Sequence, residues 1–336
     1  MKKLKALSIA LSILSGFFAQ FLQAEENAER KSSIYFIAEN DIGFSDRYYT
    51  NGLKLTYLSP SDGLLINRLQ FKFLRLLNSD KSAQPTQSLS LGQDMYVSYD
   101  IDDTNPPMTD RPYAGWLYIT DGAHIATKNT LDSFAITIGV VGEISGAEYT
   151  QKRYHEFINV DRPMGWDTQL KNEPAFTISL NHSERVFEHS LSDNFRTDFI
   201  CSAGANLGTV STEAIVKGLW RFGFNMPYSF DAARIDFSSS QQVEYAVQNR
   251  PDWHAYIYAG FAGKAVGYNM FLDGNVLRKY DRSVDKEWLV GELNFGASLR
   301  YKDFYVSYSW CVRSKEYKTE RGGVQYFSAL MIGGTF

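Results

Sequence analysis

Residues 134–140 read FAITIGV, and this short stretch indicates the fold of the whole chain. Its even positions carry large apolar side chains, while its odd positions carry small or polar ones. Side chains of a β-strand point alternately to the two faces of a sheet, so the stretch predicts a strand with one apolar face. Residues 326–336 repeat the pattern, with Tyr326, Leu330 and Phe336 at positions of one parity.

The same alternation recurs along the chain and predicts an all-β fold of twelve strands in one domain. The connections are of unequal length, and bacterial barrels combine an even strand number with short periplasmic turns and long outer loops. We therefore expect the long connections, residues 60–86, 98–111, 143–172, 225–251 and 274–286, to face outward. The predicted strands cover residues 32–41, 49–59, 87–97, 112–125, 132–142, 173–184, 195–206, 212–224, 252–273, 287–300, 302–313 and 324–336.

The composition of the 336 residues restricts the class of protein. Hydrophobic residues at 44% and aromatic residues at 15% exclude a disordered chain. No stretch after the N-terminus approaches the ~20 apolar residues that a spanning helix needs, which excludes a helical membrane protein. The 34 basic residues, against 38 acidic ones, form no basic run, so a nucleic-acid partner is not expected. A soluble globular protein and a transmembrane barrel remain.

The N-terminal residues favour the barrel. Residues 1–24 combine an early cluster of lysines, an apolar stretch and a cleavage site after Ala24, which predicts a signal peptide followed by a barrel domain at 25–336. An uncleaved anchor is the alternative. Export, strand number and aromatic content together predict a monomeric twelve-stranded antiparallel transmembrane β-barrel in a Gram-negative outer membrane. The aromatic residues expected in its membrane-interface girdles are Trp116, Tyr118, Trp166, Trp253, Trp288 and Trp310.

A polar cluster surrounds the first predicted hairpin. Asn40 and Asp41 end one strand and Thr50 begins the next, so a hairpin would bring them together. Carboxylate, amide and hydroxyl oxygens that converge at a barrel rim suit a hard cation such as Ca²⁺. The alternative, which composition alone favours, is a polar turn in which Asn, Asp and Gly provide turn chemistry.

A second candidate lies in residues 147–160, which contain neither Pro nor Gly and predict a short helix in an extracellular loop. That helix would place Gln151 and His155, four residues apart, on one face. A neutral imidazole can take a proton from water near pH 7. Asp161 follows and could add a carboxylate. A solvated surface histidine is the alternative.

Taken in order, these motifs resemble the outer-membrane lipid A 3′-O-deacylase family. The similarity spans essentially the whole mature chain and is densest over residues 34–173. The motifs that carry it are END at 39–41, DRYYTNG at 46–52, GQDMY at 92–96, DRPYAGW at 110–116, GVVG at 139–142, QKRYH at 151–155 and GWDTQL at 165–170.

The resemblance implies a Ca²⁺-dependent esterase that removes the 3′-O-linked acyl group from lipid A of lipopolysaccharide in the outer leaflet. It implies that a histidine activates water while Ca²⁺ stabilises the oxyanion. The implied catalytic residues are His155, Asn40, Asp41 and Gln151, and the implied metal ligands are Asp41, Thr50 and Asp161.

One departure concerns the substrate phosphates. Some relatives carry basic residues in the loop after the third strand, whereas residues 97–109 of this chain contain no Lys or Arg. Arg111 is then the nearest candidate for a substrate contact. Two other interpretations stay open: another outer-membrane lipid hydrolase of the phospholipase type, acting through a serine, and a non-enzymatic barrel that serves as a channel or adhesin.

Overall fold

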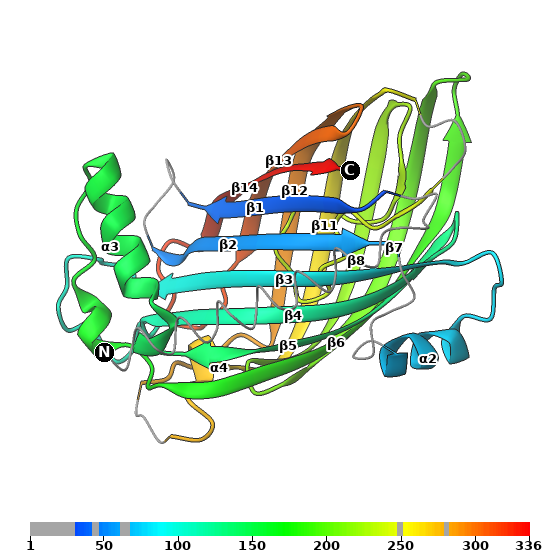
Figure 1. Ribbon diagram of the computed structural model, residues 1–336. Coiled ribbons are helices and arrows are strands. Elements are labelled where there is room, and N and C mark those ends of the chain that lie inside the picture. Colours follow the sequence, from blue (N-terminus) through cyan, green and yellow to red (C-terminus); the bar gives the residue numbers. More distant parts are fainter. Residues whose placement is uncertain (1–30, 42–46, 61–67, 247–250, 279–281) are drawn as a thin grey trace.

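The computed structural model describes residues 31–41, 47–60, 68–246, 251–278 and 282–336. The predicted signal peptide and residues 42–46 of the first hairpin lie outside these ranges. Within them, twelve long antiparallel strands close into one barrel, as predicted (Figure 1). The barrel strands are β1 (Ser33–Asn40), β2 (Tyr48–Ser59), β3 (Gln84–Val97), β4 (Ala114–Ala126), β5 (Thr130–Val141), β6 (Glu173–Ser190), β7 (Phe195–Gly208), β8 (Ser211–Phe224), β11 (Trp253–Asn269), β12 (Leu289–Tyr301), β13 (Phe304–Ser314) and β14 (Val324–Thr335).

The barrel closes where its first strand pairs with its last. The β1–β14 register runs from Ser33 opposite Thr335 to Asn40 opposite Ser328, so neither strand leaves an unpaired edge. The long run predicted at 252–273 is a single strand, β11, which ends in the short helix α4 (Met270–Asp273). The even strand number therefore holds.

The two faces of the wall differ in polarity. In β5 the side chain of Ile138 is 59% exposed, whereas Ala135 and Thr137 are fully buried toward the lumen. Large apolar side chains thus point out of the barrel, while polar side chains point inward and bind one another. This arrangement is the reverse of a soluble barrel and is the one that a lipid environment stabilises.

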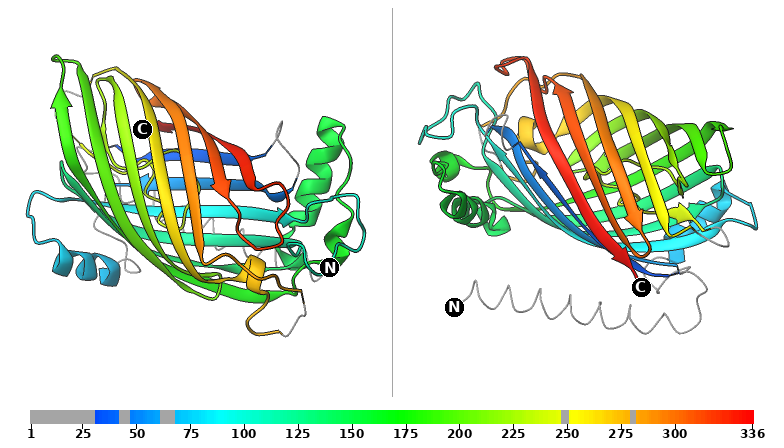
Figure 2. Two further views of the ribbon diagram at one scale, coloured as in Figure 1. Left: turned by 180° about the vertical axis from the view of Figure 1, so that it is seen from behind. Right: turned by 90° about the horizontal axis from the view of Figure 1, so that it is seen from above.

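We name the two ends of the barrel after the elements that lie at them. The α3 rim is the end where β1 and β5 finish and where helix α3 (Ala147–Ile158) lies; the terminus rim is the end where β1 begins and β14 finishes (Figures 1 and 2). Strands β2 and β8 end at the terminus rim, so the long connections that follow them begin there, which corrects the prediction that all long connections lie on the outer side of the membrane. Strand direction, and not loop length, decides the end at which each connection falls.

One of these connections folds back into the lumen, which the sequence did not predict. We call residues 230–243 the lumen segment; the two-residue strands β9 (Tyr228–Ser229) and β10 (Glu244–Tyr245) pair at its base. Its Arg234 forms ion pairs with Glu39 and Glu292 of the wall, and Lys54 Nζ donates to the main-chain oxygen of Asp236 at 2.6 Å. The segment therefore gives partners to polar side chains that β-strand alternation forces into the lumen.

The helices and aromatic residues show two further departures. Helix α2 (Arg68–Leu77) occupies a stretch that was expected to be a loop, and the short 3₁₀ turns η2 (Glu143–Ser145) and η3 (Gly165–Thr168) flank α3. None of the helices in the described ranges is long and apolar enough to cross a bilayer. Trp253, Trp288 and Trp310 are exposed as girdle residues should be, but Trp116, Tyr118 and Trp166 are buried, so the girdle prediction is wrong for these three.

Candidate active site

Helix α3 packs on the outside of the wall, against β3 and β4. The chain enters it through Gly146, whose φ of 71° belongs to the left-handed region that favours glycine. Gln93 Nε2 of β3 donates to the main-chain oxygen of Ser145 at 2.8 Å. A Cβ atom at Gly115 of β4 would lie only 2.2 Å from the Cβ of Ala147. The bare glycine therefore allows the start of α3 to touch the wall.

The helix presents Gln151 and His155 on one buried face, as its spacing predicted. The two residues are 3% and 4% exposed, so the alternative of a solvated surface histidine is wrong. His155 Nδ1 lies 2.5 Å from the main-chain oxygen of Asp161. A carbonyl oxygen can only accept a hydrogen bond, so Nδ1 carries a proton, and in the neutral tautomer with this proton the lone pair is on Nε2. The side chain of Asp161 is itself exposed, and its role as a metal ligand stays a prediction.

Trp166 binds Gln151, the other polar residue on the buried face of α3. The sequence had instead predicted Trp166 to be a girdle residue. Its indole Nε1 donates to Gln151 Oε1 at 2.9 Å, and its ring meets that of Tyr113 edge-on at 5.3 Å. Trp166 also belongs to a buried cluster with Met95 and Ala147, which joins η3, α3 and β3. The GWDTQL motif was the available signal, because it places this tryptophan close after the helix.

The first hairpin brings its polar residues together as predicted. Thr50 Oγ1 donates to Asp41 Oδ1 at 3.1 Å, and the main-chain nitrogen of Arg47 donates to Asp41 Oδ2 at 2.9 Å. Asn40 Nδ2 donates to the main-chain oxygen of Thr50 at 3.1 Å. Thr50 also sits at a β-bulge, since its neighbours Tyr49 and Asn51 pair with consecutive residues of β3. Such bulges redirect side chains and are common beside active sites.

Two residues of the first hairpin, Asn40 and Asn51, face the same side of the wall as α3. In β1, Glu39 points into the lumen and binds Arg234, so the neighbouring Asn40 points outward. Asn51 pairs directly with Met95, which packs with Ala147 of α3. The histidine helix and the oxygen-rich hairpin are therefore joined through one outward-facing residue of β3, at the α3 rim.

The oxygen atoms of the hairpin fit Ca²⁺ by their chemistry. Asn40, Asp41 and Thr50 offer an amide, a carboxylate and a hydroxyl, which are hard donors of the kind that Ca²⁺ prefers. Asp41 and Thr50 are each 3% exposed. Among the residues that the structure describes, no three His, Cys, Asp or Glu side chains gather into one group. A Ca²⁺ ion here would therefore depend on amide, hydroxyl and main-chain oxygens and on water as well as on Asp41.

Arg111 does not fit the predicted contact with a lipid phosphate. Its side chain is fully buried, and its Nη2 donates to Glu316 Oε2 at 2.7 Å while its guanidinium lies over the ring of Tyr96. Burial raises the pKa of Glu316, but Arg111 and Arg313 outweigh that effect and hold it below its ordinary value. Burial and the nearby Glu316 carboxylate raise the pKa of Glu320 to about 7. Arg111 thus stabilises acidic groups beneath the α3 rim, because its guanidinium group points into the barrel.

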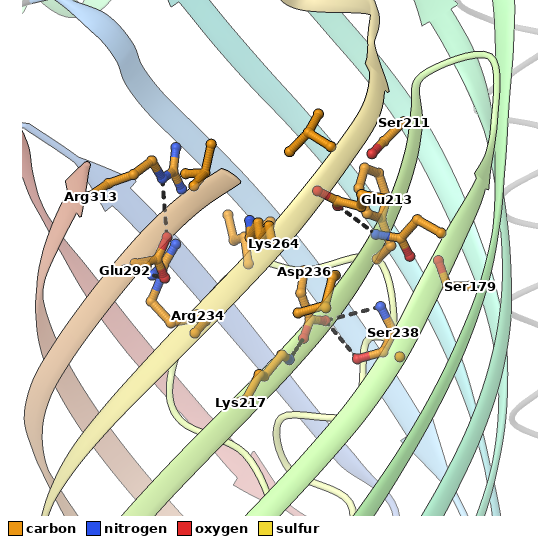
Figure 3. Close-up of a pocket in the computed structure, with 18 of the residues that line it drawn as sticks. Ser179, Ser211, Glu213, Lys217, Arg234, Asp236, Ser238, Lys264, Glu292 and Arg313 are labelled. Atoms are coloured by element: carbon orange, nitrogen blue, oxygen red, sulfur yellow. Dashed lines mark hydrogen bonds and ion pairs between the residues drawn. The ribbon is translucent and has the colours of Figure 1, made fainter. Parts of the chain in front are cut away.

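The lumen contains a separate cavity of about 190 Å³ that both charged and apolar side chains line (Figure 3). Its charged side chains are largely paired, with Lys217 Nζ 3.2 Å from Asp236 Oδ2 and Arg313 Nε 3.1 Å from Glu292 Oε2. The cavity lies inside the wall, whereas α3 packs outside it. The cavity is therefore not part of the candidate site.

Comparisons with known proteins identify the family of the chain. A family profile described as "Outer membrane protein LpxR" matches residues 7–336. No curated protein sequence is significantly similar to the chain. The solved structure of LpxR from Salmonella typhimurium is 19% identical, with a TM-score of 0.73, and the match covers 90% of this chain and all of that one. The β domain of the Bordetella autotransporter BrkA is 10% identical, with a TM-score of 0.42, and the match covers 91% of this chain and 98% of that one. The chain belongs to the family of outer membrane protein LpxR, the lipid A 3′-O-deacylases, and is an outer-membrane ester hydrolase.

Proposed function

We propose that this chain removes the 3′-O-linked acyl group from lipid A, in the outer leaflet, by Ca²⁺-dependent hydrolysis. One observation supports the proposal: helix α3, which carries His155, packs on the lipid-facing side of the wall, and Asn40 and Asn51 of the first hairpin face that same side at the same rim. The ester of a membrane lipid lies at the boundary between headgroup and acyl chains. A rim of a membrane barrel lies at the same level. One chain supplies every group of this site, which suits a monomer.

In the proposed reaction His155 acts as the general base. Its Nε2 takes a proton from a water molecule, whose oxygen attacks the ester carbonyl, and the imidazolium then returns the proton to the departing sugar oxygen. The Asp161 carbonyl keeps Nδ1 protonated throughout, and Trp166 holds Gln151 beside the base. When bound by Asn40, Asp41 and Thr50, Ca²⁺ would offset the negative charge that develops on the carbonyl oxygen, which is worth several kcal/mol.

The other two interpretations fit these contacts less well. Ser88 Oγ and His124 Nε2 lie 2.9 Å apart, but both residues are fully buried in the lumen, where a lipid ester has no access. Arg234 and Asp236 fix the lumen segment across the interior of the barrel, whereas a channel would need that interior to stay open.

The direct test is mass spectrometry of lipid A from a host that expresses the chain. We expect lipid A that lacks the 3′-O-linked acyl group, together with the released fatty acid. Unchanged acylation in membranes that contain the folded barrel would contradict the proposal. A covalent acyl-enzyme would instead favour the serine hydrolase.

Gly115→Val tests whether α3 must touch the wall. The added side chain would collide with Ala147 and Ser145, so we expect α3 to move outward and activity to fall at least about tenfold, because displacements near 1 Å can cost ~10²-fold. The measurement is the rate of deacylation, with folding checked by heat-dependent mobility on gels. Gly291→Ala is the matched control, since a Cβ there meets nothing within 4 Å. Equal rates for both variants would show that this contact does not position the helix.

A further inference from the structure

Helix α2 lies outside the barrel at the terminus rim, opposite to α3 (Figure 2). Phe71 and Leu74 pack on Ala123 and Ile125, which are outward-facing residues of β4. Just after the helix, Asn78 Nδ2 donates to Asp132 Oδ2 of β5 at 2.8 Å. The helix is therefore fixed to the lipid-facing side of the wall.

The remaining surface of α2 divides into an apolar face and a basic face. Leu69 is 79% exposed and Leu76 is 78% exposed, and Phe73 and Leu77 extend this apolar face. Arg68, Lys72 and Arg75, spaced by four and three residues, form the basic face, and the helix contains no acidic residue. At about 100° per residue, the wall-facing, apolar and basic faces lie roughly 120° apart.

The apolar face of α2 continues the lipid-facing surface of the barrel. The ring of Phe73 lies 5.6 Å from that of Phe134, which points outward from β5. Further along the same face of β5 is Ile138, which is 59% exposed. Exposure of this continuous apolar surface to water would be unfavourable, whereas acyl chains would cover both the apolar face of α2 and the outer face of β5.

The basic face of α2 meets the second requirement for a helix that lies at a membrane surface. Arg68, Lys72 and Arg75 are exposed and form no ion pair within the described chain. A helix with an apolar face and a Lys- and Arg-rich face lies at the boundary between acyl chains and headgroups and favours anionic lipid. The apolar and basic faces of α2 thus both match one binding partner, an anionic phospholipid.

We infer that α2 is a membrane-interface helix that inserts Leu69, Phe73 and Leu76 among acyl chains and binds lipid phosphates through Arg68, Lys72 and Arg75. The choice of leaflet rests on the proposed function. Because lipid A meets the α3 rim, α2 at the opposite rim contacts the phospholipid leaflet that faces the periplasm.

The apolar face is tested in phospholipid vesicles with a fluorescent label on the thiol that Leu76→Cys introduces into the full chain. The exposed Cys201 is replaced by Ser, and the buried Cys311 is kept. We expect lipid-borne quenchers to reduce the emission several-fold while aqueous iodide has little effect. A label introduced by Lys81→Cys, in the exposed turn after α2, should show the reverse. Iodide access at position 76 equal to that at position 81 would overturn the proposal, as would shielding that requires an added protein.

The basic face is tested by native mass spectrometry of the full chain in detergent, titrated with phosphatidylglycerol. Each neutralised charge should weaken binding about fivefold, so Arg68→Gln combined with Lys72→Gln and Arg75→Gln should weaken it roughly a hundredfold. Lys81→Gln should change it little. Unchanged binding by the triple variant would overturn this half of the proposal. Neither readout involves lipid A, so a failure to detect deacylation would leave both results standing and remove only the leaflet assignment.

Discussion

Replacing His155 with Gln should lower the rate of lipid A deacylation by about 10²–10⁴-fold, the range that a positioned general base contributes. Glutamine keeps the size and hydrogen-bonding character of the side chain, so the contact with the Asp161 carbonyl can persist. It has no nitrogen that accepts a proton near neutral pH, so water would no longer be activated. The measurement is the single-turnover rate on purified lipid A in mixed micelles.

His189→Gln is the matched control for this experiment. His189 is exposed near the end of β6 at the terminus rim, far along the barrel from α3. We expect this variant to keep the wild-type rate. If His155→Gln also keeps it, with the barrel folded, the base must be another group and the mechanism proposed here is wrong.

Replacing Asp41 with Asn should be nearly as damaging, with a loss of about 10²–10³-fold at limiting Ca²⁺. The substitution preserves shape and removes one negative charge from the hairpin, where Asp41 accepts hydrogen bonds from Thr50 and Arg47. We expect calorimetry to show weaker Ca²⁺ binding. In the wild type, chelation should stop turnover and added Ca²⁺ should restore it.

The control for Asp41 is another acidic residue at the same rim. Asp285 lies in the connection between β11 and β12 with its side chain 83% exposed, paired only loosely with Lys318 at 3.5 Å. Asp285→Asn should leave Ca²⁺ binding and activity unchanged. Wild-type affinity for Ca²⁺ in Asp41→Asn would place the metal elsewhere, and full activity under chelation would remove Ca²⁺ from the reaction.

Sequence reasoning succeeded where a local pattern determines the structure. The strand positions follow from alternation with a period of two, and the face shared by Gln151 and His155 follows from helix geometry. The contact between Asp41 and Thr50 follows from a short hairpin between adjacent strands. Each of these relations joins residues that lie close together in the chain.

The errors have a common cause. Arg68–Leu77 mixes apolar and basic residues so that its helix depends on packing against β4, which its own sequence does not reveal. Trp166 has the composition of a girdle residue, yet Gln151 and Tyr113 bury it. Arg111 was expected at the lipid surface. It points inward because it binds Glu316, which lies 205 residues further along the chain.

The sequence by itself therefore determined that this chain forms a twelve-stranded outer-membrane barrel, because strand alternation and polarity are local properties. It also singled out the imidazole and the oxygen donors of the candidate site. Only the tertiary structure decided that α3 packs on the face of the wall to which Asn51 points, that Thr50 occupies a bulge, and that Arg234 of the lumen segment binds Glu39 of the wall. Those features depend on contacts between distant strands, whose register is set by the closure of the whole barrel.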